Sequence, residues 1–129
     1  MTIFSKIIAG KIPAYTIAES ELFIAFLDIL PVKKGHVLVV PKIEVDKIFD
    51  VPDSYLSALL AFAKPIAKAI EKAFPCNRVN MLTVGLEVPH AHLHLIPTDT
   101  AADMNLANIK LQLSKEEFTA IQQQIIACL

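Results

Sequence analysis

The sequence predicts an α+β fold, a five-stranded antiparallel sheet with one long central helix and short terminal helices. Helical spacing of apolar residues recurs in three segments, and five short apolar segments have the character of strands. Neighbouring strands are joined by short polar turns, which favours antiparallel pairing. The expected order is helix, three strands, long helix, two strands and helix, in a single domain covering residues 1–129.

The first half of the chain contains the short helix and three of the strands. Segment Ile3–Gly10 has isoleucines at helical spacing, and its glycine ends the helix. Segments Ala14–Ser20 and Leu22–Ile29 are strand-like and nearly contiguous, so we expect a hairpin. Segment Gly35–Lys42 is apolar and β-branched, and Pro41 ends this third strand.

The second half begins with the long helix, which we expect over Pro52–Phe74 because proline fits the first turn. Pro65 lies inside this helix and is expected to kink it. Two strands follow, Arg78–Gly85 and His90–Pro97. A capping-box signature that begins at Ser114 opens the last helix.

Composition and charge exclude several classes of function. The formal net charge is −1, with 12 basic and 13 acidic side chains, so nothing predicts a surface for nucleic acid or for an anionic membrane. No apolar segment suits export or membrane insertion, and Cys76 and Cys128 match no disulfide, metal or redox spacing, which favours a cytoplasmic protein. The apolar content of 54% predicts a full core or a buried surface between subunits.

The stretch PHAHLHLIP holds three of the four histidines of the chain at alternate positions, His90, His92 and His94. Side chains two apart on a strand share a face, so these three imidazoles should project from one side of the sheet. The apolar residues between them should point to the core. Three histidines in register indicate chemistry rather than packing.

Two kinds of chemistry fit such a cluster. Neutral imidazole is a common ligand of transition metals, although Glu87 is the only carboxylate near enough in sequence to complete a site. Alternatively, one histidine attacks a phosphorus atom while its neighbours donate hydrogen bonds and protons. The fourth histidine, His36, opens the third strand and does not decide between the two.

Three segments carry a resemblance to a known family. The motif HAHLHLIP resembles the His-φ-His-φ-His-φ-φ signature of the histidine triad family, where φ is apolar. The segment IFSKIIAGKIP is similar to the opening of that family, and AFLDILPVKKGHVLVVPK to its central block. The resemblance covers residues Ile3 to Thr98.

The resemblance implies a homodimer that binds a purine nucleoside phosphate and reacts at its α-phosphorus. His92 would be the nucleophile that forms a nucleotidyl-histidine. His90 and His94 would contact phosphate, orient the ring and carry protons, and His36 would complete the network. Asp28 would hold the ribose hydroxyls, a task that suits a carboxylate with several lone-pair sites; from its position alone it could equally be a turn residue.

Apolar residues at positions that line the base pocket of the family are Phe26, Ile29 and Leu38. Ordinary core packing explains them equally well. Phe4 and Ile7 are weaker candidates for the same pocket.

The loop before the histidines departs from the family pattern. It is shortened, and Leu86 and Glu87 stand where a glutamine and a serine are common. An ionised Glu87 accepts hydrogen bonds but cannot donate them, so it would repel a polyphosphate leaving group or pair with a cationic amine. Asn80 and Thr83 are the candidates for an asparagine of the family that the motif does not place.

Many relatives hold a structural zinc through an N-terminal Cys-x-x-Cys and a histidine after the third strand. This chain has Thr2, Ser5 and Glu44 at those positions, so we expect no metal.

These observations predict a phosphoramidase-like hydrolase or transferase that acts on purine nucleoside phosphoramidates or nucleotidyl esters and needs no cofactor. Two alternatives remain open, a nucleotide-binding module with little turnover and a histidine metal-site protein.

Overall fold

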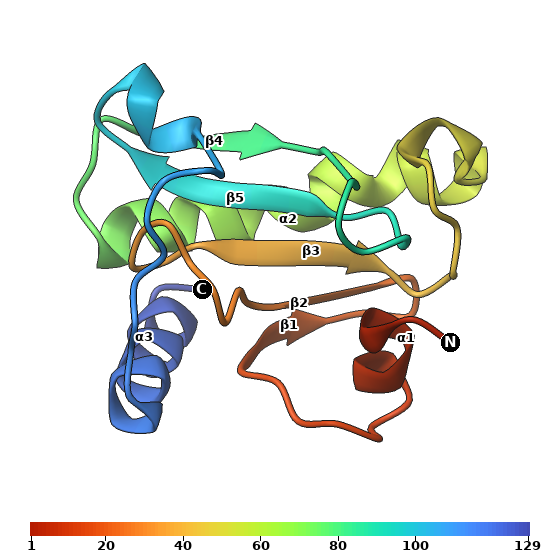
Figure 1. Cartoon of the computed structure of the whole chain (residues 1–129), viewed down its shortest axis with the longest axis horizontal. Coiled ribbons are helices and arrows are strands. Elements are labelled where there is room, and N and C mark those ends of the chain that lie inside the picture. The colour runs from red at the N-terminus through yellow and green to blue at the C-terminus, as the bar shows by residue number, and fades with distance from the viewer.

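The computed structural model describes all 129 residues, and it confirms the predicted α+β order (Figure 1). The helices and strands are, in chain order, α1 (Ile3–Ile8), β1 (Thr16–Glu19), β2 (Phe23–Leu27), β3 (Val37–Pro41), α2 (Asp53–Ala73), β4 (Arg78–Leu82), β5 (Leu93–Thr98) and α3 (Lys115–Ala127). Two short 3-10 helices, η1 (Ile48–Asp50) and η2 (Ala101–Met104), were not predicted. None of the helices has the length and apolar character that a membrane-spanning segment needs.

The five strands form one antiparallel sheet in the order β1-β2-β3-β5-β4. Its register sets one row of side chains across three strands, because Leu38 of β3 pairs with Phe26 of β2 on one side and with His94 of β5 on the other. Directly paired residues share a face of the sheet. Two predicted apolar pocket residues and one histidine therefore stand side by side.

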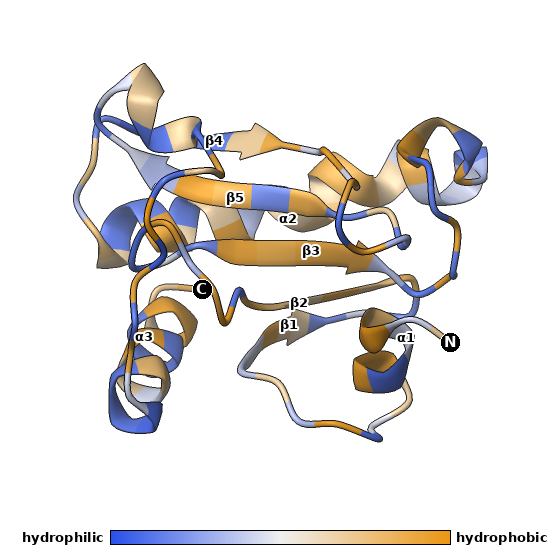
Figure 2. Ribbon diagram, in the orientation of Figure 1, coloured by the Kyte–Doolittle hydropathy of each residue, from blue (hydrophilic) through white to orange (hydrophobic).

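The two faces of the sheet are covered differently (Figures 1 and 2). Helices α2 and α3 pack against one face, where the main core of 16 buried residues includes Leu93 and Leu95 of β5. Helix α1 packs on the other face through Phe4, in a smaller cluster with Phe26 and Leu38. The apolar residues that alternate with the histidines thus reach the main core, as predicted, while His94 lies on the face of α1.

Strand β5 begins later than expected. The predicted strand started at His90, but β5 starts at Leu93 because the preceding backbone bonds elsewhere. The N–H of His90 donates to the carbonyl of Val88 at 2.8 Å, and the N–H of Ala91 donates to the carbonyl of Val45 at 2.7 Å. Two of the three clustered histidines therefore lie in an irregular segment that is tied to its neighbours outside the strand ladder.

Helix boundaries follow the local signals closely. Gly10 has a φ of +74° just after α1, a conformation that favours glycine at a helix end. Pro52 caps α2 instead of opening its first turn, and the helix runs from Asp53 to Ala73 as one element despite Pro65. Ser114 and Glu117 form the predicted capping box of α3.

Candidate active site

A cavity of about 500 Å³ opens on the sheet face that carries α1. Its walls come from α1, from β2 and β3, from the loop before the histidines and from the segment after η2. The ionisable side chains that line it are Asp28, His36, Glu87, His92, His94 and Lys110. Its size falls in the range of about 300–1,000 Å³ that is usual for small-molecule sites.

His92 is held so that one ring nitrogen is left with a free lone pair. Its Nδ1 lies 2.7 Å from the carbonyl oxygen of His90, and because a carbonyl only accepts, Nδ1 carries the proton. The Nε2 atom is then unprotonated, and the ring lines the cavity. Phe4 packs edge-on against the ring at a centroid distance of 4.9 Å, and burial lowers the pKa of His92. Neutral His92 is thus a competent nucleophile or base.

His94 and His36 form a hydrogen-bonded pair in which the tautomer of each ring is defined. The backbone N–H of Val32 donates to His36 Nδ1 at 3.2 Å, so the proton of His36 is on Nε2. That Nε2 lies 2.8 Å from His94 Nδ1 and donates to it, which leaves His94 with a proton on Nε2. Burial lowers the pKa of His36 to about 3 and that of His94 to about 4. Neutral His94 therefore has a hydrogen-bond donor beside the ring of His92, whose centroid is 4.9 Å away.

Asp28 directly follows β2 and lies beside this pair of histidines. Its Oδ2 is 3.4 Å from His36 Nε2, and its Oδ1 accepts from the N–H of Leu30 at 2.9 Å. Because His36 is neutral, the first contact is not an ion pair. Burial raises the pKa of Asp28, although the bond from Leu30 opposes the rise. The turn interpretation and the site interpretation both fit this geometry, since the carboxyl group caps a turn and also lines the cavity.

His90 differs from the expectation that it contacts phosphate. It is fully buried and does not line the cavity. Its Nε2 donates to the carbonyl of Pro41 at 2.9 Å, so its Nδ1 is an acceptor and receives the hydroxyl of Thr2 at 2.8 Å. Both ring nitrogens are used by the protein itself because Thr2 and the end of β3 close over them. The geometry gives His90 only the second expected role, that of orienting His92 through its carbonyl.

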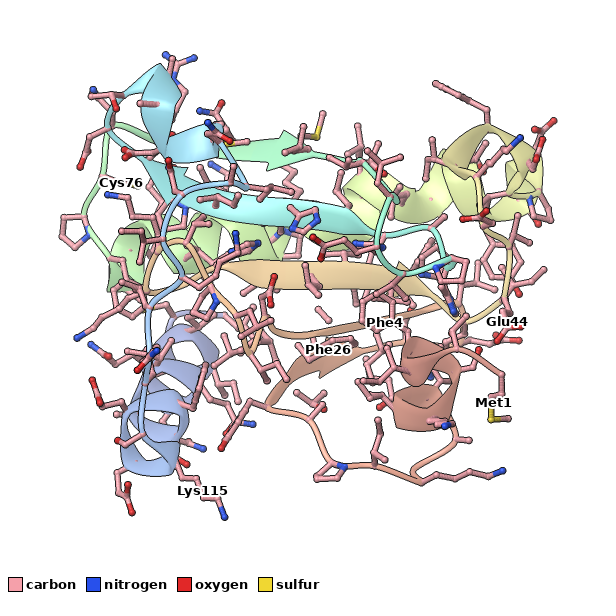
Figure 3. All side chains as sticks on the ribbon, in the orientation of Figure 1. Met1, Phe4, Phe26, Glu44, Cys76 and Lys115 are labelled. Atoms are coloured by element: carbon pink, nitrogen blue, oxygen red, sulfur yellow. The ribbon has the colours of Figure 1, made fainter.

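The apolar part of the cavity contains the predicted pocket residues and others. Phe26 and Leu38 form its floor, and Phe4 packs on Phe26 at a centroid distance of 5.5 Å (Figure 3). Ile29 is at the rim, with 61% of its surface exposed, since β2 has already ended. Residues that the sequence did not single out complete this region, namely Ile3, Ile12, Pro13, Ala14, Leu27, Leu30, Val84 and Val88.

The altered loop places both Leu86 and Glu87 at the cavity, and Leu86 is 88% exposed. Neither candidate for the missing asparagine lines the cavity. Asn80 donates to the hydroxyl of Thr98 at 2.7 Å, and Thr83 donates to the carbonyl of His92 at 2.8 Å. Thr83 therefore steadies the backbone of His92 instead of reaching a ligand.

The segment after η2 contributes residues that sequence reasoning missed. Leu106, Ala107 and Lys110 all line the cavity. Figure 1 shows this part of the chain running from η2 towards α3 past the ends of the central strands. No motif marks the segment, and only the path of the chain in space brings it to the histidines.

A scan against family models finds the HIT domain, the domain of the histidine triad, over residues 9–101. The chain belongs to the HIT family. Adenosine 5′-monophosphoramidase HNT1 of Saccharomyces cerevisiae is 41% identical to it over 100 residues, which cover 74% of this chain and 61% of HNT1. The chain thus spans under two thirds of the length of that relative.

Other relatives match the HIT chain over nearly its whole length. Adenosine 5′-monophosphoramidase hnt1 of Schizosaccharomyces pombe is 34% identical over 125 residues, covering 95% of this chain and 94% of that protein. A crystal structure of a HIT-like protein from Bartonella henselae superimposes with a TM-score of 0.86 at 30% identity, covering 99% of this chain and 96% of the other. The HIT-like fold is thereby confirmed.

The positions of the HIT structural zinc hold a hydrogen-bonded network in this chain. Glu44 accepts from the backbone N–H of Thr2 at 2.6 Å and from the hydroxyl of Ser5 at 2.7 Å, and Thr2 reaches His90. Two hydroxyls and one carboxylate that already satisfy one another are a poor donor set for zinc, which prefers thiolate and imidazole. These residues do not fit the metal.

One other group of side chains has the composition of a metal site. Ligand atoms of Asp28, His36 and His94 all lie within 4.8 Å of one another. A metal there would have to replace the 2.8 Å hydrogen bond between the two histidines. That bond already satisfies one nitrogen of each ring.

Proposed function

We propose that this HIT-family protein hydrolyses purine nucleoside phosphoramidates or nucleotidyl esters, with attack of His92 on the α-phosphorus. The observation that carries the proposal is the 2.7 Å bond from His92 Nδ1 to the carbonyl of His90, which leaves Nε2 unprotonated at the cavity. Relatives named adenosine 5′-monophosphoramidase support the class of substrate.

The first step would form a bond from His92 Nε2 to phosphorus and break the bond from phosphorus to the leaving nitrogen or oxygen. The imidazole ring becomes cationic as it is nucleotidylated, and the carbonyl of His90 stabilises the proton on Nδ1. Negative charge on the phosphate oxygens or the leaving atom is met by the Nε2–H of His94. A leaving amine departs with a proton taken up from water.

The second step would reverse the attack with water as the nucleophile. Water forms a bond to phosphorus and gives up one proton to the solvent, the bond to His92 Nε2 breaks, and the nucleotide is released with neutral imidazole restored. The order of roles follows from the tautomers: His92 has a lone pair to offer, and His94 has a proton to share. The carbonyl of His90 sets the tautomer of His92, and the Nε2–H of His36 sets that of His94.

The rest of the cavity suits a nucleoside. Asp28 offers acceptor oxygens for two adjacent ribose hydroxyls, and Phe4, Phe26 and Leu38 offer an apolar surface for a purine. We also propose that Glu87 disfavours polyphosphate leaving groups and favours uncharged or cationic amines, since its carboxylate faces the same cavity. The active form is proposed to be a homodimer, with no nucleic-acid or membrane partner and no cofactor.

The decisive experiment compares wild type, His92→Ala and Asp28→Ala with adenosine 5′-phosphoramidate as substrate. Loss of a covalent route should reduce single-turnover hydrolysis by His92→Ala on the order of 10³-fold or more, while nucleotide affinity stays largely intact. Asp28→Ala should mainly weaken binding. Rapid-quench mass spectrometry of wild type should show the nucleotidyl adduct.

The same assay tests the alternatives. Tight binding without turnover by wild type would identify a binding module. Activity that disappears on dialysis against EDTA and returns with zinc would identify a metal-dependent protein. If His92→Ala keeps more than about a tenth of wild-type turnover, a difference of only ~1.4 kcal/mol in activation free energy, His92 is not the nucleophile.

A further inference from the structure

The cavity has an unusual balance of charge for a site that receives a phosphate anion. Two carboxyl groups face it, those of Asp28 and Glu87. The three histidines that line it are neutral at pH 7, since burial lowers the pKa of His36 to about 3 and that of His94 to about 4, and also lowers that of His92. Lys110 is the only lysine or arginine among the lining residues. Its positive charge is therefore the only one in the cavity lining that offsets the negative charge of the carboxylates.

The ammonium group of Lys110 is placed by its own loop. Its Nζ donates to the carbonyl of Leu106 and, at 3.2 Å, to the carbonyl of Asn108. An ammonium has three donors, so these two bonds fix its position and leave one N–H for another acceptor. The positive charge of Lys110 adds to the lowering of the pKa values of His36 and His94, which burial mainly causes, and it opposes the rise in the pKa of Asp28 that burial causes. Lys110 lines the same cavity as Asp28, His36 and His94, which surround the proposed phosphate site.

We propose that Lys110 binds a phosphate oxygen of the nucleotide through this remaining N–H. The assignment rests on the proposed function, since it requires a nucleotide in the cavity. It makes Lys110 the cation of a site whose other donors are neutral, and a charge-assisted hydrogen bond is about twice as strong as a neutral one. The segment after η2 then contributes directly to recognition of the phosphate.

A purely structural role would be different in its consequences. If Lys110 only tied down the loop, its loss would disturb Leu106 and Ala107, which line the same cavity as the base pocket. Such a change would weaken every nucleoside ligand to a similar degree. A phosphate contact would weaken only ligands that carry a phosphate.

The test measures the affinity of AMP and of adenosine by isothermal titration calorimetry for wild type, Lys110→Met, Lys110→Arg and Lys115→Met. Lys110→Met should weaken AMP about 10- to 100-fold while adenosine stays within about twofold of wild type. Lys110→Arg should keep most of the AMP affinity. Lys115 is the matched control, an exposed lysine at the first turn of α3 that points away from the sheet (Figure 3), and its loss should change neither ligand.

Each other outcome overturns the assignment. Equal losses for AMP and adenosine in Lys110→Met would show a structural tie, and unchanged AMP affinity would show no role in binding. A wild type that binds AMP and adenosine equally well would exclude a specific phosphate contact. Binding of neither ligand by wild type would remove the proposed function as well, and so is distinguishable from failure of the lysine alone.

Discussion

At the scale of single residues, the protonation state of each histidine is set by the group that each ring nitrogen contacts. Backbone carbonyls accept hydrogen bonds from the ring N–H groups of His90 and His92, and a backbone N–H donates a hydrogen bond to His36 Nδ1. The proton of His94 then follows from its contact with His36. The four histidine rings therefore differ in which nitrogen donates and which accepts a hydrogen bond. A backbone carbonyl can only accept and a backbone N–H can only donate, whereas water can do either.

These contacts predict how stability depends on pH. The pKa values of His36 and His94 in the folded protein, about 3 and about 4, are below the 6.5 of an exposed histidine. The unfolded chain therefore binds more protons than the folded one as pH falls below 6.5. The free energy of unfolding should drop by up to about 1.4 kcal/mol per pH unit for each histidine between pH 6 and pH 4.5.

Urea unfolding between pH 7.5 and pH 4.5 measures this slope. The raised pKa of Asp28 acts in the opposite direction, since a protonated carboxyl is favoured in the folded state at low pH. His36→Asn, which cannot titrate, should have a flatter profile than wild type at the acid end. Stability that stays constant or rises on acidification would contradict the neutral histidine pair.

At the scale of elements, the hydroxyl of Thr2 links the start of α1 to a histidine of the site. Thr2 is the N-cap of this helix, accepting from the N–H of Ser5 at 3.0 Å, and it also donates to buried His90. The helix in turn presents Phe4 to the ring of His92. A helix of six residues has little stability of its own, so its position depends on such tertiary contacts.

Removal of this hydroxyl should therefore affect both stability and catalysis. Thr2→Val keeps the shape of the side chain but leaves buried His90 Nδ1 with only the longer contact to the Ser5 hydroxyl, at 3.5 Å, and leaves the helix without its cap. We expect a loss of about 1–3 kcal/mol in the free energy of unfolding, together with reduced turnover. Thr2→Ser keeps the hydroxyl and is the matched control. Equal stability of the two variants in guanidinium unfolding would show that the bond to His90 contributes little.

At the scale of the whole molecule, the sheet ends in an open edge. Strand β4 pairs only with β5, and an unpaired edge is normally covered or protected. Met81 on β4 is 55% exposed, which places apolar surface on that edge strand. An apolar content of 54% is consistent with further burial between subunits.

We predict a dimer that uses this edge. Light scattering after size exclusion should report twice the chain mass of 14.2 kDa at micromolar concentration. Met81→Glu should shift the population towards monomer by burying an unpaired charge at the interface. Phe49→Glu, at another exposed apolar residue, is the control and should not. A wild-type monomer throughout the concentration range would exclude the dimer.

Much of this architecture could be predicted from local patterns. The alternation of apolar residues identified the strands, and the capping signatures identified helix ends. The spacing of His90, His92 and His94 predicted a cluster of histidines, of which His92 and His94 line one cavity. These patterns depend only on residues that are close in sequence, because backbone geometry fixes which side chains share a face of a helix or strand. The family resemblance then selected phosphate chemistry over a metal site.

The sequence by itself identified most of the candidate site residues, and the tertiary structure decided which of them line the cavity and which nitrogen of each histidine carries the proton. His90 was separated from its expected phosphate role because Thr2, 88 positions away, occupies its ring nitrogen. Lys110 reached the cavity because the chain after η2 returns past the central strands. Contacts between distant segments depend on how the whole chain packs, and no local spacing encodes them. The protonated nitrogen of each histidine, and the presence of Lys110 at the cavity, therefore follow only from the folded structure.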